Sequence, residues 1–193
     1  MKVEVFHIDG PLLLTPVRHE DERGFFSEVF RLDNIEPLIG QYKFVQENHS
    51  FSLGVGVLRG LHFQRPPFAQ GKLVRVVRGR VLDVIVDARA GSPTYGEHIS
   101  VELSWNDWRQ LWVPPGFLHG FCTLSPEVEF LYKVTSYYSA LHDGVVAFDD
   151  PDLDINWPFP REELNLSSKD ASAPRLFEID APFPKSWEAR PVN

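Results

Sequence analysis

The chain has 193 residues, of which 43% are hydrophobic and 24% charged, so it is long and apolar enough for one well-packed domain and is not disordered. Its formal net charge of −8 argues against a surface for nucleic acid or an anionic membrane, although a few arginines in a cleft can still bind a small anion. The single cysteine, Cys122, cannot form an internal disulfide, and no apolar segment is long enough for a signal peptide or a membrane span. We therefore expect one cytoplasmic domain at residues 1–193, with its core at about 1–183 and a tail at 184–193.

Short apolar runs separated by turns predict an all-β chain, and the 16 prolines lie mostly at the joints between those runs. Strands are expected at residues 3–8, 12–17 and 25–30, with a charged turn at 19–24 and a brief helix at 32–39. Further strands are expected at 44–51, 73–77, 81–86, 98–103, 110–113, 117–124 and 128–135. Such even spacing is typical of a sandwich or barrel. After Gly144 the pattern weakens into an irregular segment, whose proline-rich last thirteen residues are expected to lie against the surface or a partner.

Residues 58–72 are the most polar stretch between the predicted strands. Because side chains alternate along a strand, His62 and Gln64 share one face, which is therefore polar while the other is packed. Arg59 falls on the opposite face from His62, so the two can share a site only where the chain is kinked between them. Gly60 can supply that kink, since a glycine inside a strand often marks a bulge.

A second informative stretch is Pro114-Pro115-Gly116-Phe117-Leu118-His119, in which Pro-x-Gly-x-x-His resembles the second motif of the cupins, jelly rolls in which this histidine faces the interior. A metal-binding cupin also carries His-x-His and a glutamate in its first motif. Here that motif reads His62-Phe63-Gln64, without a nearby glutamate. Two histidines and an amide fall short of the three good ligands that a transition metal needs, so we expect no metal site.

Seven motifs in order resemble the dTDP-4-dehydrorhamnose 3,5-epimerase family over roughly residues 1–183. The resemblance implies a cupin-type jelly roll, a double-stranded β-helix with short peripheral helices, that forms a homodimer. It also implies that C3 and C5 of dTDP-4-dehydro-6-deoxy-D-glucose are inverted without a cofactor, on the way to dTDP-L-rhamnose. The motifs are Asp21-x-Arg23-Gly24-x-Phe26-x-Glu28, Gln46-x-Asn48-x-Ser50, Arg59-Gly60-Leu61-His62-Phe63-Gln64, Gln70-x-Lys72-Leu73-Val74, Ser92-Pro93-Thr94-x-Gly96, Pro115-x-Phe117-x-His119-Gly120-Phe121 and Ser168-Lys169-Asp170.

The resemblance assigns the chemistry to four residues. A ketone acidifies the hydrogens on both neighbouring carbons, so the reaction needs a base, a group that stabilises the enolate oxygen, and an acid on the opposite face. His62 matches the base, since an imidazole in water has a pKa of about 6.5 and suits proton abstraction at neutral pH. Asp170 matches the carboxylate that orients His62, Lys72 the enolate stabiliser, and Tyr132 the acid.

Other positions match residues that bind substrate. Arg23 and Arg59 are expected to hold the pyrophosphate, because a guanidinium binds phosphate oxygens in pairs. An inward Asp83 is a further candidate, although a turn or surface position is commoner for an aspartate. The remaining matches are Phe25 in the sugar pocket, Glu28, Gln46, Asn48 and Lys169 at the nucleotide, Tyr138 stacked on thymine, His119 at the substrate, and Asp143, where the family often has glutamate.

Three other functions stay open. An epimerase that inverts only one carbon of a 4-keto-6-deoxy sugar nucleotide needs the same base, lysine and tyrosine, so the motifs do not separate it from a 3,5-epimerase. A metal-dependent cupin oxygenase or isomerase needs a third histidine and a glutamate, which are missing. A non-catalytic binding module needs Arg23 and Arg59 but not His62 or Tyr132, and all four are present.

Overall fold

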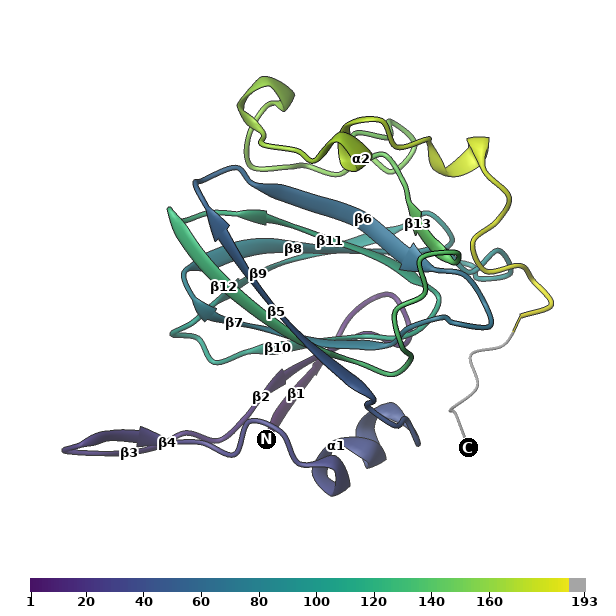
Figure 1. Ribbon diagram of the computed structural model, residues 1–193. Helices are drawn as coiled ribbons and strands as arrows, with labels where there is room; N and C mark the ends of the chain where they lie inside the picture. The colour runs from purple at the N-terminus through teal and green to yellow at the C-terminus, as the bar shows by residue number, and fades with distance from the viewer. Residues whose placement is uncertain (188–193) are drawn as a thin grey trace.

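Two antiparallel sheets form the body of the protein (Figure 1), and the computed structural model describes residues 1–187. In spatial order, the six-stranded sheet contains β1 (Lys2–Val5), β2 (Leu12–Thr15), β10 (Gln110–Val113), β7 (Lys72–Arg78), β12 (Glu127–Val134) and β5 (Gln46–Leu53). The five-stranded sheet contains β13 (Asp143–Val145), β6 (Leu58–Gln64), β11 (Phe117–Thr123), β8 (Arg80–Asp87) and β9 (His98–Ser104). Neighbouring strands in both sheets are antiparallel, and the predicted all-β jelly roll is confirmed.

The main hydrophobic core lies between the two sheets. Val74 and Leu111 from the six-stranded sheet pack there with Ile85 from the five-stranded sheet. Across the gap, the rings of Phe121 on β11 and Phe130 on β12 stack with centroids 4.4 Å apart and an interplanar angle of 16°. These contacts join the sheets through side chains, because strands of different sheets share no hydrogen-bonded ladder.

The irregular C-terminal segment covers the outer face of the five-stranded sheet (Figure 1). It contains α2 (Ser168–Ala171) and two 3-10 helices, Arg161–Glu163 and Leu176–Glu178. Phe183 is 1% exposed and packs against Phe63 of β6, with ring centroids 6.1 Å apart. This cover explains why β8 and β11 are buried on both faces. Phe183 thus anchors the end of the predicted core. The tail expected at 184–193 stays a prediction, and its residues 188–193 lie outside the described part of the chain.

Helix α1 (Leu32–Ile39) has the bounds that the sequence predicts. Its fully buried Ile35 packs on Leu14, Leu73 and Trp112, which point outward from the six-stranded sheet. The negative charge of Asp33 in the first turn stabilises the helix, because it lies near the positive end of the helix dipole. Among the described residues, no helix is long and apolar enough to cross a membrane.

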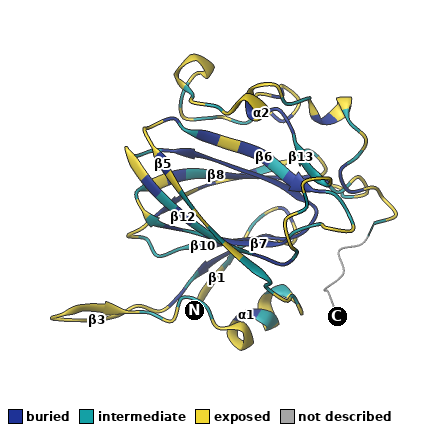
Figure 2. Cartoon of the chain, in the orientation of Figure 1, coloured by how far each residue is buried: buried dark blue, intermediate teal, exposed yellow. Residues whose placement is uncertain are grey.

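A small hairpin of β3 (His19–Asp21) and β4 (Gly24–Phe26) projects from the body and is exposed along its length (Figure 2). The predictions for this region, a charged turn at 19–24 and a strand at 25–30, were wrong in their bounds. Arg23 and Asp21 close a tighter turn, in which the backbone N–H of Arg23 donates to the side-chain carboxylate of Asp21 at 2.9 Å. Three-residue strands that are exposed on both faces have no hydrophobic alternation to mark them.

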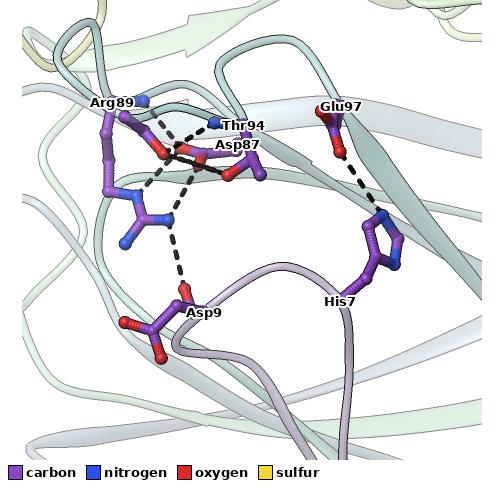
Figure 3. A network of polar contacts seen from close by, with 7 residues as sticks. His7, Asp9, Asp87, Arg89, Thr94 and Glu97 are labelled. Carbon is purple, nitrogen blue, oxygen red and sulfur yellow. Dashed lines mark hydrogen bonds and ion pairs between the residues drawn. The ribbon is translucent and has the colours of Figure 1, made fainter.

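Buried Asp87 at the end of β8 is hydrogen-bonded to residues of the loop that follows this strand (Figure 3). Its carboxylate accepts hydrogen bonds from Arg89 Nε at 2.9 Å, Ser92 Oγ at 2.6 Å and Thr94 Oγ1 at 2.7 Å. Burial works to raise the pKa of Asp87, but these donors outweigh it and lower the pKa below the usual value. Arg89 also donates to the backbone carbonyl of Asp9 at 3.1 Å. The motif at residues 92–96 thus has a structural role in this fold.

Candidate active site

A cavity of about 490 Å³ lies between the two sheets. The stacked rings of Phe121 and Phe130 form part of its apolar lining, and the rest is largely polar. Most of the site residues expected from the sequence line this cavity: Gln46, Asn48, Arg59, His62, Lys72, His119, Tyr132, Tyr138, Asp143 and Asp170.

His62 and Asp170 meet at the wall formed by β6. Nε2 of His62 lies 2.8 Å from Oδ1 of Asp170, although Asp170 comes from α2, far downstream in the chain. Ser167, the N-cap of α2, donates its hydroxyl to Oδ2 of Asp170 at 2.7 Å and accepts the Asp170 backbone N–H at 3.1 Å. Burial works to raise the pKa of Asp170, but the contacts with His62 and Ser167 outweigh it and keep the pKa low. An ionised Asp170 can therefore hold the imidazole in one orientation.

A second histidine and carboxylate lie on the same wall. His119 on β11 is paired with His62 in the ladder, and its Nε2 lies 3.0 Å from both carboxylate oxygens of Asp83 on β8. This contact holds the imidazole of His119 in one orientation beside His62. Asp83 is fully buried, so the turn or surface position that the sequence favoured is wrong, and the inward position is the one observed.

Lys72 begins β7 on the opposite sheet and is buried. Burial lowers its pKa to about 8, even though the carboxylates of Asp83 and Asp143 act to raise it. Near neutral pH the ammonium group is thus charged but poorly solvated. A cation in this condition stabilises negative charge that develops beside it.

Tyr132 on β12 also belongs to the opposite sheet, and its ring packs near Phe130 with centroids 6.2 Å apart. Burial raises the pKa of its phenol, Arg59 acts to lower it, and Asp143 raises it further. The net shift is upward, so the phenol keeps its proton at neutral pH. It is then available as a proton donor.

Arg59 reaches the cavity through a bulge in β6. His119 is paired with His62 and Phe121 with Arg59, so β6 contains one residue more than β11 between these pairs. Gly60 has a φ of +123°, and a Cβ there would lie 2.5 Å from the Cα of Gly120. The kink expected from Gly60 is present, and it puts Arg59 and His62 on the same cavity.

Polar residues at one side of the cavity form a connected chain. Tyr138 donates its hydroxyl to Oδ2 of Asp143 at 3.1 Å, and Lys169 donates to the same oxygen at 2.6 Å. Gln46 and Asn48 on β5 share a hydrogen bond of 2.8 Å. Lys169 does not itself line the cavity but adjoins it through Asp143.

Besides Lys169, three expected site residues do not line the cavity, and they lie on or just after the projecting hairpin (Figure 1). Arg23 pairs with Asp21, and Phe25 packs edge-on against Trp108 with centroids 4.6 Å apart. Glu28 accepts a hydrogen bond from Asn34 at 3.1 Å. A single copy of the chain does not bring these three to the other site residues.

No group of three or more histidine, cysteine, aspartate or glutamate side chains in residues 1–187 is arranged to hold a metal ion. Gln64, which occupies the position of a cupin metal ligand, has its amide hydrogen-bonded to backbone atoms of Phe68, Tyr137 and Ser139. The amide is therefore committed to the protein.

Residues that sequence reasoning missed are Ser167, which supports Asp170, and Gln70, which lines the cavity. A signal for Ser167 was present. Ser167-Ser168-Lys169-Asp170 fits Ser-x-x-Asp, a common start of a helix in which the serine caps the first turn.

The fold and the cavity define a class of protein: a jelly roll with an imidazole and a carboxylate on one wall, and a lysine and a phenol on the other, is equipped for proton transfer to and from a small polar ligand. The family described as dTDP-4-dehydrorhamnose 3,5-epimerase matches residues 5–178 of this sequence. The chain belongs to this family and is a sugar nucleotide epimerase, as its motifs predicted.

Individual relatives agree over most of their length. The dTDP-4-dehydrorhamnose 3,5-epimerase of Salmonella typhimurium is 52% identical over 170 residues, which cover 88% of this chain and 92% of the relative. The crystal structure of dTDP-6-deoxy-D-glucose-3,5-epimerase from Legionella pneumophila, in complex with dTDP-4-keto-L-rhamnose, has a TM-score of 0.91 at 44% identity and covers 97% of this chain and 99% of its own. A 3'-monoepimerase from Streptomyces bikiniensis, in complex with dTDP-quinovose, has a TM-score of 0.83 at 34% identity and covers 89% of this chain and 86% of its own.

Proposed function

We propose that this enzyme converts dTDP-4-dehydro-6-deoxy-D-glucose to dTDP-4-dehydro-L-rhamnose by removing and returning a proton at C3 and at C5. One observation carries the proposal: His62 and Tyr132 line a single cavity from opposite sheets. A sugar held between them has a base on one face and an acid on the other, which is what inversion of a carbon centre requires. The similar Legionella enzyme, whose crystal structure contains dTDP-4-keto-L-rhamnose, supports the same substrate class.

In this proposal His62 removes the proton from the carbon next to the 4-keto group. The C–H electrons move into the ring, and the keto oxygen becomes an enolate. Asp170, 2.8 Å from His62, orients the imidazole and stabilises its charged form. Lys72 faces the enolate oxygen with its positive charge, and a donor of this kind contributes about a hundredfold to a thousandfold to the rate.

The second half of each inversion is return of a proton from the opposite face. Tyr132 gives its phenolic proton to the enolate carbon, which restores the ketone with inverted configuration. The resulting phenolate recovers its proton from solvent, and His62 releases the abstracted one. Because the raised pKa keeps the phenol protonated, Tyr132 is ready for each cycle at neutral pH. No metal or organic cofactor takes part in this sequence.

The nucleotide part of the substrate is assigned to the polar side of the cavity. Arg59 binds the pyrophosphate, while His119 contacts the sugar and is held by Asp83. Tyr138 stacks on the thymine. The residues placed around the nucleotide are Gln46, Asn48, Asp143 and Lys169.

A homodimer is part of the proposal. Strand β1 is the edge of its sheet and leaves Val5 78% exposed, and an edge strand can pair with a second copy. In such a dimer the hairpin of one copy supplies Arg23, Phe25 and Glu28 to the other's cavity. Sedimentation of purified protein as a monomer at micromolar concentration would argue against this. We also propose a cytoplasmic location, which agrees with the free, buried Cys122.

The decisive experiment is incubation of the protein with dTDP-4-dehydro-6-deoxy-D-glucose in heavy water. Deuterium at both C3 and C5, with both configurations inverted by NMR, is the expected result. Exchange and inversion at one carbon alone would assign the protein to the single-carbon epimerases, a class represented by the 3'-monoepimerase above. Loss of activity with a chelator and its recovery with iron or manganese would instead identify a metal-dependent enzyme.

A further inference from the structure

Gln64 is the buried amide that follows the proposed base on the same face of β6. Its side chain is 3% exposed and makes three hydrogen bonds to backbone atoms. Nε2 donates to the carbonyl oxygens of Phe68 at 2.8 Å and Tyr137 at 3.1 Å, and Oε1 accepts the backbone N–H of Ser139 at 2.6 Å. A single side chain thus joins the loop after β6 to the segment after β12.

That segment, residues 136–139, has no helical or strand structure and takes most of its backbone partners from glutamine side chains. Besides the two bonds from Gln64, Gln70 Nε2 donates to the carbonyl of Ser136 at 2.8 Å. Gln46 Oε1 accepts the N–H of Tyr138 at 3.1 Å. Backbone N–H and C=O groups that are buried or half-buried need hydrogen-bond partners. The glutamine amides supply them to residues 136–139, as a neighbouring strand does in a sheet.

The side chain that this arrangement positions is Tyr138, which lines the cavity and is 59% exposed. Its hydroxyl is bonded to Asp143, whose strand β13 pairs with β6 so that Asp143 lies opposite Gln64. The backbone of Tyr138 is held from one side by Gln46 and its neighbours by Gln64. The backbone and the hydroxyl of Tyr138 are therefore both held, while more than half of the residue stays exposed.

We propose that Gln64 is a positioning residue for nucleotide binding. By fixing residues 137–139 it holds the ring of Tyr138 where the base of dTDP stacks, so that the ligand does not have to order this segment on binding. The inference rests on the proposed function, because it takes the nucleotide to be the ligand of Tyr138. It also explains why an amide stands at the position where metal-binding jelly rolls have a histidine: the side chain donates two hydrogen bonds and accepts one, whereas a neutral imidazole has one donor and one acceptor.

The test is the Gln64→Met variant, which keeps the length of the side chain but cannot form these hydrogen bonds. We expect its Kd for dTDP, measured by calorimetry, and its KM for the sugar nucleotide to rise by about fivefold or more, the range that base stacking contributes. We expect kcat to stay near the wild-type value, because His62, Lys72 and Tyr132 are left in place. In a Tyr138→Ala background the same substitution should change the Kd little, since the two residues act on one contact.

Gln70→Met and Thr123→Val complete the experiment. Gln70→Met removes one bond to the same segment and should raise the Kd in the same direction, even where Gln64→Met yields little folded protein. Thr123→Val removes a buried hydroxyl that donates to the backbone of Gly54 at 2.8 Å, so it should lower the melting temperature and leave the Kd unchanged.

An unchanged Kd in Gln64→Met, an equal rise in the Tyr138→Ala background, or an equal rise in Thr123→Val would each overturn the inference. Wild-type protein that binds no dTDP would overturn the proposed function and the inference with it. These results are distinguishable because the wild-type affinity is measured first.

Discussion

Tyr132→Phe separates formation of the enolate from inversion. The substitution removes one oxygen and keeps the ring beside Phe130, so the fold is expected to survive. His62 and Lys72 remain, and the enolate still forms. With no acid on the far face, the carbon recovers its hydrogen from the side that it left. We therefore expect inversion to fall by about a hundredfold to ten-thousandfold, the usual contribution of a general acid, while exchange with solvent persists at one carbon at least.

His62→Ala is the matching variant, because without the base neither exchange nor inversion should occur. The substitution removes the imidazole that contacts Oδ1 of the buried Asp170, which should lower the free energy of unfolding by about 1–3 kcal/mol. Folding is therefore checked by circular dichroism. The assay follows deuterium at C3 and C5 by NMR in heavy water for both variants and the wild type. Near-normal inversion in Tyr132→Phe would refute the reasoning and make Tyr132 a packing residue.

Three further predictions follow from Lys72, Asp170 and Gly60. Since Lys72 has a pKa of about 8 and acts in its charged form, kcat/KM should fall as the pH rises through about 8. A pH profile of Lys72→Arg should lack this fall, because arginine keeps its charge. Asp170→Asn should lower kcat by about a hundredfold or more while calorimetry gives an unchanged Kd for dTDP, and a large rise in that Kd would count against an orienting role. Gly60→Ala should lower the free energy of unfolding, measured in urea, by about 1–3 kcal/mol or more, because φ is +123° and the new Cβ would meet the backbone of Gly120. Gly96→Ala is the control: its Cβ would have open space around it, so the free energy of unfolding should fall by less.

The strands that cross the core could be predicted from the sequence because one or both of their faces are apolar. β10 and α1 have the predicted bounds, β11 ends one residue earlier than predicted, and β12 is shifted by one residue at both ends. The hairpin of β3 and β4 and the short β13 could not be found in the same way. Their residues are exposed or half-buried, so their position depends on turns and on pairing with β6 rather than on burial.

The candidate site was predictable where its residues share one strand. His62 and Gln64 lie on one face as alternation requires, and Gly60 allowed Arg59 to be placed with them. Asp170 was different, because nothing local connects it to His62, and only the resemblance to a family suggested the pair. The backbone partners of Gln64 were also out of reach, since carbonyl and N–H groups have no sequence pattern.

The path of the chain between the sheets accounts for the arrangement of the cavity. β6 lies in the five-stranded sheet and β7, the next strand, in the six-stranded sheet, so one connection takes the chain from the wall with His62 to the wall with Lys72. β11 and β12 repeat this step and bring His119 and Tyr132 to the same two walls. Each of the two crossings thus puts a histidine on the wall of the five-stranded sheet. It puts a lysine or a tyrosine on the wall of the six-stranded sheet. The strand order of the jelly roll therefore puts these groups on opposite walls of the cavity, which is the arrangement that the proposed chemistry on two faces of a sugar requires.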